Sequence, residues 1–185
     1  MYRYSGPHSY INAIVVPSTQ LKEEYVRETL ESLREAGIDF VSGVPDTWLR
    51  SVFEALQDDK RFTFVPVSNE GVAFSICAGA WLAGKKPCLL MENSGLRVAA
   101  EALSRLSVSD GIPVFILMSY RGSLAETEYF SIGHGKTMEP LLQAFRIPYV
   151  VVRKPEDLRK GITGAAKLAF TSQYPAAAAL GGELM

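Results

Sequence analysis

The chain has 185 residues, of which 48% are hydrophobic and 21% charged, and its formal net charge at pH 7 is −1. A chain of this length suits one domain with a single core, and its dispersed charges lack the basic footprint of a nucleic-acid-binding protein. Cys77 and Cys88 stand in apolar segments, which favours buried thiols over a disulfide framework or a zinc site, so no metal ligands are expected.

Residues 1–20 are expected to form an N-terminal extension of the domain. Their apolar stretch, residues 10–16, is too short to cross a bilayer and lacks the charged start and small-residue cleavage pattern of a signal peptide. These features predict a cytoplasmic protein with no membrane partner. Either an added edge strand or a partly ordered arm is compatible with the sequence of this extension.

Residues 21–172 alternate short apolar segments with segments of helical periodicity. Strands are predicted at residues 38–42, 62–67, 87–91, 113–118 and 148–152, and helices at residues 21–36, 46–56, 71–83, 95–106, 137–145 and 155–170. The alternation predicts an α/β fold of three layers, in which a doubly wound, mainly parallel sheet is covered on both faces. Ligands of such sheets bind at the carboxyl ends of the strands.

Two stretches depart from this alternation. Residues 119–135 show no periodicity between a strand and a helix, and loops of that length are usually functional or mobile. Residues 173–185 contain the alanine run 176–179 between Pro175 and two glycines, and are therefore predicted to be a C-terminal tail.

The segment FVPVSNEG, residues 64–71, ends a buried-type strand with a single carboxylate, Glu70, at the point where a helix begins. Its ordinary interpretation is a helix N-cap, in which Asn69 caps the helix and Glu70 interacts favourably with the helix dipole. The carboxyl end of a strand is also where open α/β sheets place their chemistry. Glu70 is therefore a candidate functional residue as well.

The surrounding segments carry a family resemblance over roughly residues 21–170. GIDFVSGVPDTWLRSVFEAL (residues 37–56) precedes the SNEG turn, and AGAWLAGKKPCLLMENSGL (78–96) and SDGIPVFILMSYRG (109–122) follow it. In order and spacing these segments resemble the pyrimidine-binding (Pyr) domain of thiamine-diphosphate-dependent 2-oxoacid decarboxylases, which is flavodoxin-like. The resemblance is strongest to the separate α subunits of sulfopyruvate and phosphonopyruvate decarboxylases.

This resemblance implies that Glu70 is the catalytic glutamate. In the family, that residue hydrogen-bonds the cofactor's aminopyrimidine ring and favours the imino tautomer, whose exocyclic nitrogen removes the thiazolium proton. The predicted cofactor-binding residues are Glu70, Val44, Pro45, Asn93, Ser94 and Gly95. The turns that contain the last five lead into helices whose free N–H groups can hold an anion. Ordinary capping is favoured for Asp46 and is an equal alternative for Asn93 and Ser94.

Cationic residues are candidates for binding the second anion of an acidic 2-oxoacid: Arg97, Arg121, His134 and Lys136. Arg97 and Val98 replace the Gly-Asn pair that commonly follows NSGL in the decarboxylase subunits. His134 and Lys136 lie at the end of the non-periodic stretch, and Arg121 directly follows a strand. A structural histidine or a solvated arginine is the ordinary alternative.

The motif that binds the diphosphate half of the cofactor in this family is not found in the sequence. Family members bind magnesium and the diphosphate through a GDG motif and a later asparagine, whereas this chain has Ser109-Asp110-Gly111 and no asparagine after Asn93. The predicted partner is therefore a β (PP-type) subunit that holds the Mg²⁺, in an α2β2 or larger hetero-oligomer.

The predicted function is the α subunit of a two-subunit decarboxylase acting on 3-sulfopyruvate, 3-phosphonopyruvate or a related 2-oxoacid. The alternatives are a thiamine-dependent acyl-transfer or ligase subunit and a non-catalytic, flavodoxin-like docking partner.

Overall fold

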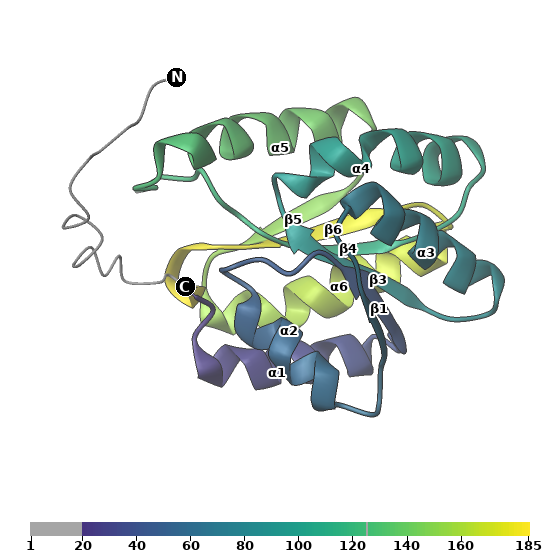
Figure 1. Cartoon of the computed structure of the whole chain (residues 1–185), viewed down its shortest axis with the longest axis horizontal. Helices are drawn as coiled ribbons and strands as arrows, with labels where there is room; N and C mark the ends of the chain where they lie inside the picture. The colour runs from purple at the N-terminus through teal and green to yellow at the C-terminus, as the bar shows by residue number, and fades with distance from the viewer. Residues whose placement is uncertain (1–19, 125) are drawn as a thin grey trace, which may run out of the picture.

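Six parallel strands form one sheet in the order β2-β1-β3-β4-β6-β5 in the computed structural model, which describes residues 20–124 and 126–185 (Figure 1). The strands are β1 (Phe40–Gly43), β2 (Thr63–Pro66), β3 (Pro87–Glu92), β4 (Phe115–Ser119), β5 (Tyr149–Val152) and β6 (Ala176–Leu180). The helices are α1 (Glu23–Glu35), α2 (Arg50–Asp58), α3 (Glu70–Leu82), α4 (Gly95–Leu103), α5 (Ile132–Ala144) and α6 (Leu158–Ser172). A π-helical segment (Ser104–Ser109) continues α4.

Two hydrophobic cores sandwich the sheet. Helices α1, α2 and α6 cover one face, and α3, α4 and α5 cover the other (Figure 1). Successive residues of one strand enter different cores: Leu90 packs on the α1 side and Leu89 on the α3 side, and both are fully buried. Burial on both faces explains why the central strands read as continuous apolar runs. The predicted three-layer α/β architecture with a parallel sheet is confirmed.

The prediction of a C-terminal tail over residues 173–185 is wrong. Ala176–Leu180 forms β6, which pairs with β4 on one side and β5 on the other, and all five of its residues are buried. Alanine is depleted in strands, so an alanine run carries little strand signal. Hydrogen bonding to two neighbours and burial on both faces override that weak local preference.

The prediction of a loop over residues 119–135 is also wrong at its far end. A 3₁₀ turn spans Tyr129–Ser131 and α5 begins at Ile132, so His134 and Lys136 lie in the first turns of a helix. Glycine weakens the helical signal at the start of α5. Gly122 and Gly135 are nevertheless both required there, because the backbone of each lies too close to the other for a side chain. A Cβ on Gly135 would collide with the carbonyl oxygen of Gly122.

The structure also bears on the predictions for the N-terminal extension, for the two cysteines and for membrane-spanning helices. The predicted N-terminal extension lies almost wholly outside the described residues. Cys77 and Cys88 are buried free thiols, as predicted, and burial raises the pKa of Cys77 to about 12. Among the described helices, none combines the length and apolarity that crossing a membrane requires.

Candidate active site

A cleft of 560 Å³ lies where β1, β2 and β3 end. The register places Gly43 of β1 opposite Pro66 of β2 and Leu90 of β3, so the segments that follow these strands meet at one edge of the sheet. The lining comes from the segment after β1, from α2, from the first residue of α3 and from the end of β3: Val44, Pro45, Asp46, Thr47, Arg50, Phe53, Glu54, Gln57, Glu70, Glu92 and Ser94. The predicted residues that meet here are Val44, Pro45, Glu70 and Ser94.

Glu70 is the first residue of α3 and is half-buried in this cleft. Asn69 caps the helix, since its side-chain Oδ1 accepts a hydrogen bond from the backbone N–H of Val72 at 3.1 Å. The capping prediction for Asn69 is thus confirmed. Among the described residues, no hydrogen bond or ion pair engages the Glu70 carboxylate. Its oxygens are therefore available to a ligand.

Asp46 lines the cleft and also closes the turn before α2. Its Oδ1 accepts a hydrogen bond from the backbone N–H of Trp48 at 2.6 Å, and the Ser119 hydroxyl lies 3.4 Å from its Oδ2. Burial, with a smaller contribution from the charge of Glu92, raises the pKa of Asp46 to about 6 against the lowering effect of the Trp48 hydrogen bond. The prediction that Asp46 caps the helix is wrong, because α2 begins at Arg50 with Leu49 as its N-cap residue and has no side-chain cap. Asp46 instead closes the preceding turn and gives the cleft wall a carboxyl group with a raised pKa.

Glu92, at the end of β3, is a site residue that the sequence prediction missed. Its Oε1 lies 3.0 Å from Nδ1 of His134 in α5, and its Oε2 lies 4.0 Å from Nη1 of Arg121. Glu92 therefore connects the cleft wall with the start of α5. Glu92 could have been identified by the same signal as Glu70, because it too is a carboxylate at the carboxyl end of a buried strand.

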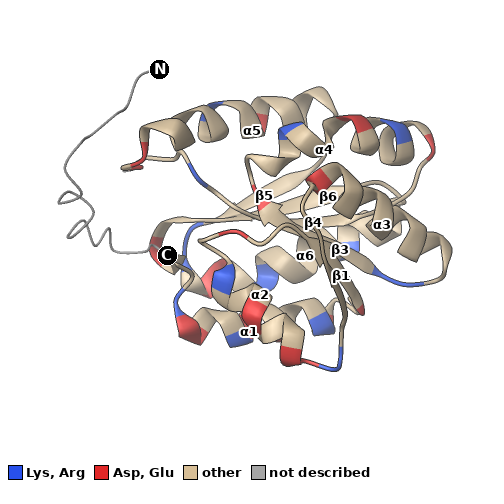
Figure 2. Cartoon of the chain, viewed as in Figure 1, with Lys and Arg blue, Asp and Glu red and all other residues tan. Residues whose placement is uncertain are grey.

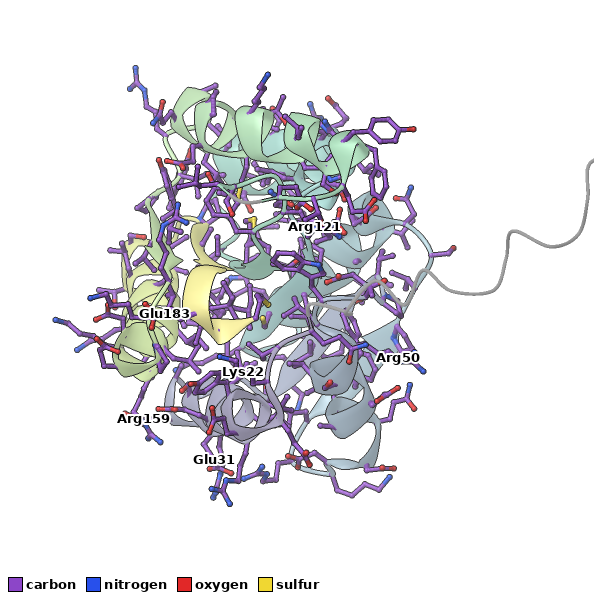
Figure 3. All side chains as sticks on the ribbon, turned by 90° about the vertical axis from the view of Figure 1, so that its left-hand side faces the viewer. Lys22, Glu31, Arg50, Arg121, Arg159 and Glu183 are labelled. Carbon is purple, nitrogen blue, oxygen red and sulfur yellow. The ribbon has the colours of Figure 1, made fainter. Side chains whose placement is uncertain are left out.

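Arg121 is only 7% exposed, and its guanidinium forms an ion pair with Glu126 inside the protein. Its guanidinium donates to both oxygens of Glu126 at 2.9 and 3.1 Å and lies 4.6 Å from the centre of the Trp48 ring. Figure 3 shows Arg121 within the molecule, in contrast to Arg50 and Arg159 at its periphery. These contacts hold the guanidinium of Arg121 inside the protein, and its role in substrate binding stays a prediction.

Asn93 is 1% exposed and ties β3 to the segment after β4. Its amide nitrogen donates to the backbone carbonyl of Arg121 at 2.8 Å, and its amide oxygen accepts from the backbone N–H of Arg121 at 3.2 Å. The side chain is absent from the cleft lining. Its amide therefore serves a structural link, and the role of Asn93 as a cofactor ligand stays a prediction.

The remaining cationic candidates lie outside the lining of the cleft. Arg97 of α4 is exposed, and its Nη1 lies 3.5 Å from the hydroxyl of Thr137 in α5. Lys136 is exposed as well, so His134 approaches the site most directly, through Glu92. Arg50 is the cation of the lining, and it pairs with Glu54 at 2.8 Å. The described lining is therefore acidic, which the sequence did not predict.

Comparison with known proteins relates the chain to one family of enzyme subunits. No family model matches the chain. The α subunits of sulfopyruvate decarboxylase from Methanococcus maripaludis and Methanocaldococcus jannaschii are each 36% identical to it, over 147 and 146 residues. These alignments cover 80% and 79% of the chain and 88% and 86% of the two subunits. The chain belongs to the family of sulfopyruvate decarboxylase α subunits. The predicted resemblance is thereby confirmed.

More distant similarities agree with this membership. A phosphonopyruvate decarboxylase from Streptomyces hygroscopicus is 30% identical over 101 residues, which are 55% of this chain and 25% of that protein. The structure of a 2-oxoglutarate:ferredoxin oxidoreductase from Magnetococcus marinus superimposes with a TM-score of 0.64 at 19% identity, over 86% of this chain and 29% of that chain. At that identity the similarity shows the fold alone.

Proposed function

We propose that this family member is the pyrimidine-binding α subunit of a two-subunit, thiamine-diphosphate-dependent decarboxylase. Its substrate is an acidic 2-oxoacid of the kind named for its relatives, sulfopyruvate or phosphonopyruvate. The observation that carries the proposal is Glu70, a carboxylate without a protein partner among the described residues, in a cleft at the carboxyl ends of parallel strands.

The residues of the cleft fit the pyrimidine half of the cofactor. When bound, thiamine diphosphate supplies a carbanion that adds to the 2-oxoacid carbonyl and accepts the electrons released with CO₂. The task of this chain is to hold a proton at the right atom. The free carboxylate of Glu70 suits that task, because one carboxyl group can share a proton with a ring nitrogen. Val44 and Pro45 provide an apolar wall beside it.

A second subunit is proposed for the magnesium ion and the diphosphate, in an α2β2 or larger assembly. Asp110, in the nearest approach to a diphosphate motif, precedes β4 and so lies at the amino edge of the sheet, opposite the Glu70 cleft. The relatives are named as α subunits, which supports a partner chain. In this proposal the partner contributes the part of the site that these residues lack.

The surface between α3 and α4 is proposed as the place where that subunit docks. A shallow groove of 680 Å³ runs beside the cleft, and its lining includes Asn69 and Gly71 on either side of Glu70. Val72 and Val98 are about half exposed there, at 50% and 49%. Helix α3 carries no charge after Glu70, and Figure 2 shows it uncoloured beyond its first turn. Such an apolar surface beside the cleft is suited to a permanent protein contact.

The acidic lining affects how the substrate is held. A sulfonate or phosphonate needs cationic partners, yet the described lining offers Arg50, which is already paired with Glu54. In this proposal the second anion is bound outside that lining, by the start of α5 near His134 and by the partner subunit.

Reconstitution tests the proposal. The chain is mixed with a diphosphate-binding subunit of its own source, thiamine diphosphate and Mg²⁺, and CO₂ release is measured from sulfopyruvate, phosphonopyruvate and pyruvate. We expect turnover only in the assembled enzyme, with an aldehyde as the product. A ligated product in place of the aldehyde would point to acyl transfer. Absence of cofactor binding in the assembly would leave a non-catalytic docking role.

A further inference from the structure

Gly95 of α4 lies directly against the side chain of Glu70. A Cβ at position 95 would be 2.5 Å from Glu70 Cγ, 2.8 Å from its Cδ and 2.7 Å from its Oε1. These separations are below the 3.0 Å that real Cβ atoms respect. The carboxylate can therefore occupy its present place only while residue 95 has no side chain.

The backbone at this position does not itself require glycine. Gly95 begins α4 and is buried, and it is not among the described glycines with positive φ, which are Gly37, Gly84, Gly111, Gly122 and Gly182. Glycine in a helix is also less favourable than alanine. The space left by the missing Cβ is thus what this glycine provides, and Glu70 fills that space.

The surroundings leave the backbone at Glu70 little room to shift away from an added methyl group. The Asn69 cap fixes the backbone at the start of α3. Helices α3 and α4 pack side by side, so closely that a Cβ on Gly71 would lie 3.4 Å from the carbonyl oxygen of Val98. Any adjustment must therefore come mainly from the side-chain torsions of Glu70, and these set where its oxygens point.

We propose that Gly95 is a positioning residue for Glu70: its missing side chain fixes the carboxylate where it reaches the pyrimidine ring nitrogen of the cofactor. This inference rests on the proposed function. A hydrogen bond that transfers or shares a proton needs heavy-atom distances of roughly 2.6–3.2 Å. An added methyl group must displace the carboxylate, and the displacement changes the distance from its oxygens to the ring nitrogen. Gly95 was predicted to act through its backbone N–H, and the structure adds this second role.

A double-mutant cycle in the full chain tests the contact without reference to catalysis. The variants are Gly95→Ala, Glu70→Ala and the two combined, and the measurement is the thermal midpoint of each. We expect Gly95→Ala to lower the midpoint by several degrees when Glu70 is present, and to leave it unchanged or raise it when residue 70 is alanine. Equal shifts in both backgrounds would overturn the inference. The double variant has room for both side chains, so it is expected to fold.

The matched control for the cycle is Gly79→Ala in α3. Apart from its chain neighbours and the adjacent backbone of α3, no described heavy atom lies within 4 Å of a Cβ at position 79. Alanine there is expected to raise the midpoint slightly in both backgrounds, because it favours the helix.

Proton exchange at the cofactor's reactive carbon, measured in the assembled enzyme, tests the positioning role. We expect Gly95→Ala to slow exchange at least tenfold and to lower kcat more than it raises KM, while Gly79→Ala matches the parent. If Glu70→Gln slows exchange but Gly95→Ala does not, the positioning role is wrong and the proposed function stands. If Glu70→Gln leaves exchange unchanged, the proposed role of Glu70 fails, whereas the stability cycle still reports the contact.

Discussion

Nδ1 of His134 lies 3.0 Å from Oε1 of Glu92, across the boundary between α5 and the wall of the cleft. The Nδ1 atom is buried and makes no aligned hydrogen bond with a described residue. A protonated imidazole at this place would offset the carboxylate and bring a positive charge towards an otherwise acidic site. Among the predicted cationic residues, His134 thus makes the shortest contact with a residue of the cleft lining.

Replacement of His134 is expected to change substrate preference. In the assembled enzyme, His134→Gln should raise KM for sulfopyruvate or phosphonopyruvate about tenfold and leave KM for pyruvate nearly unchanged, since pyruvate has no second anion. Lys136→Gln is the control, because Lys136 is an exposed residue of the same helix. A preference between acidic and neutral 2-oxoacids that is the same in His134→Gln as in the parent would exclude His134 as the anion's partner.

Glu70→Gln is expected to slow cofactor activation by roughly a hundredfold or more while the subunit still folds and assembles. Folding should persist because Asn69, and not Glu70, caps α3. The measurement is proton exchange at the reactive carbon of thiamine diphosphate. Glu23→Gln, at an exposed first-turn position of α1, is the control for loss of a carboxylate. An unchanged exchange rate in the assembled variant would reduce Glu70 to an ordinary first-turn residue.

Arg121→Ala is expected to lower the free energy of unfolding by about 3 kcal/mol, because it leaves a buried carboxylate without its partner. Hydrogen bonds from Arg121 lower the pKa of Glu126 to about 2, as expected for a closely held pair. Arg50→Ala breaks the exposed pair with Glu54 and should cost at most about 0.5 kcal/mol. Urea denaturation of both variants checks the contrast. Similar losses in the two would contradict the structural role of Arg121.

Local sequence predicted the features that depend on local chemistry. The SNEG turn contains its own capping residue, and the strand before it identifies the edge of the sheet to which Glu70 belongs. Val44, Pro45 and Ser94 were found in the same way, as residues that follow strands. Strand ends of a parallel sheet share one edge, so residues far apart in the chain could be placed together without coordinates.

The features that were missed depend on partners distant in sequence. The amide of Asn93 is engaged by the backbone of Arg121, 28 residues away, and nothing near Asn93 indicates it. The pairing of Glu92 with His134 depends on where α5 begins. Gly122 and Gly135 allow the backbone to pass closely there, and glycine weakens the helical pattern of the sequence. The alanine strand β6 is stabilised by its two neighbours and its burial, against its own propensity.

The contribution of Asp46 to the free energy of unfolding is expected to depend on pH. Burial raises its pKa to about 6, whereas in the unfolded chain an aspartate titrates near 3.9. Between those values the folded protein binds more protons than the unfolded chain, so the free energy of unfolding falls as the pH rises through 6. Above pH 6 the folded protein carries the full cost of a buried charge, and below about pH 4 that cost is absent.

Asp46→Asn should therefore raise the free energy of unfolding by about 1–2 kcal/mol at pH 7.5 and change it little at pH 4. Asparagine keeps an oxygen for the backbone N–H of Trp48, which Asp46 now binds at 2.6 Å, and it brings no charge. Asp58→Asn, at the exposed end of α2, is the control and should have a small effect at both pH values. Urea titrations of the three proteins at pH 4 and pH 7.5 make the comparison. Equal effects of Asp46→Asn at the two pH values would mean that its carboxyl group is not buried as a charge.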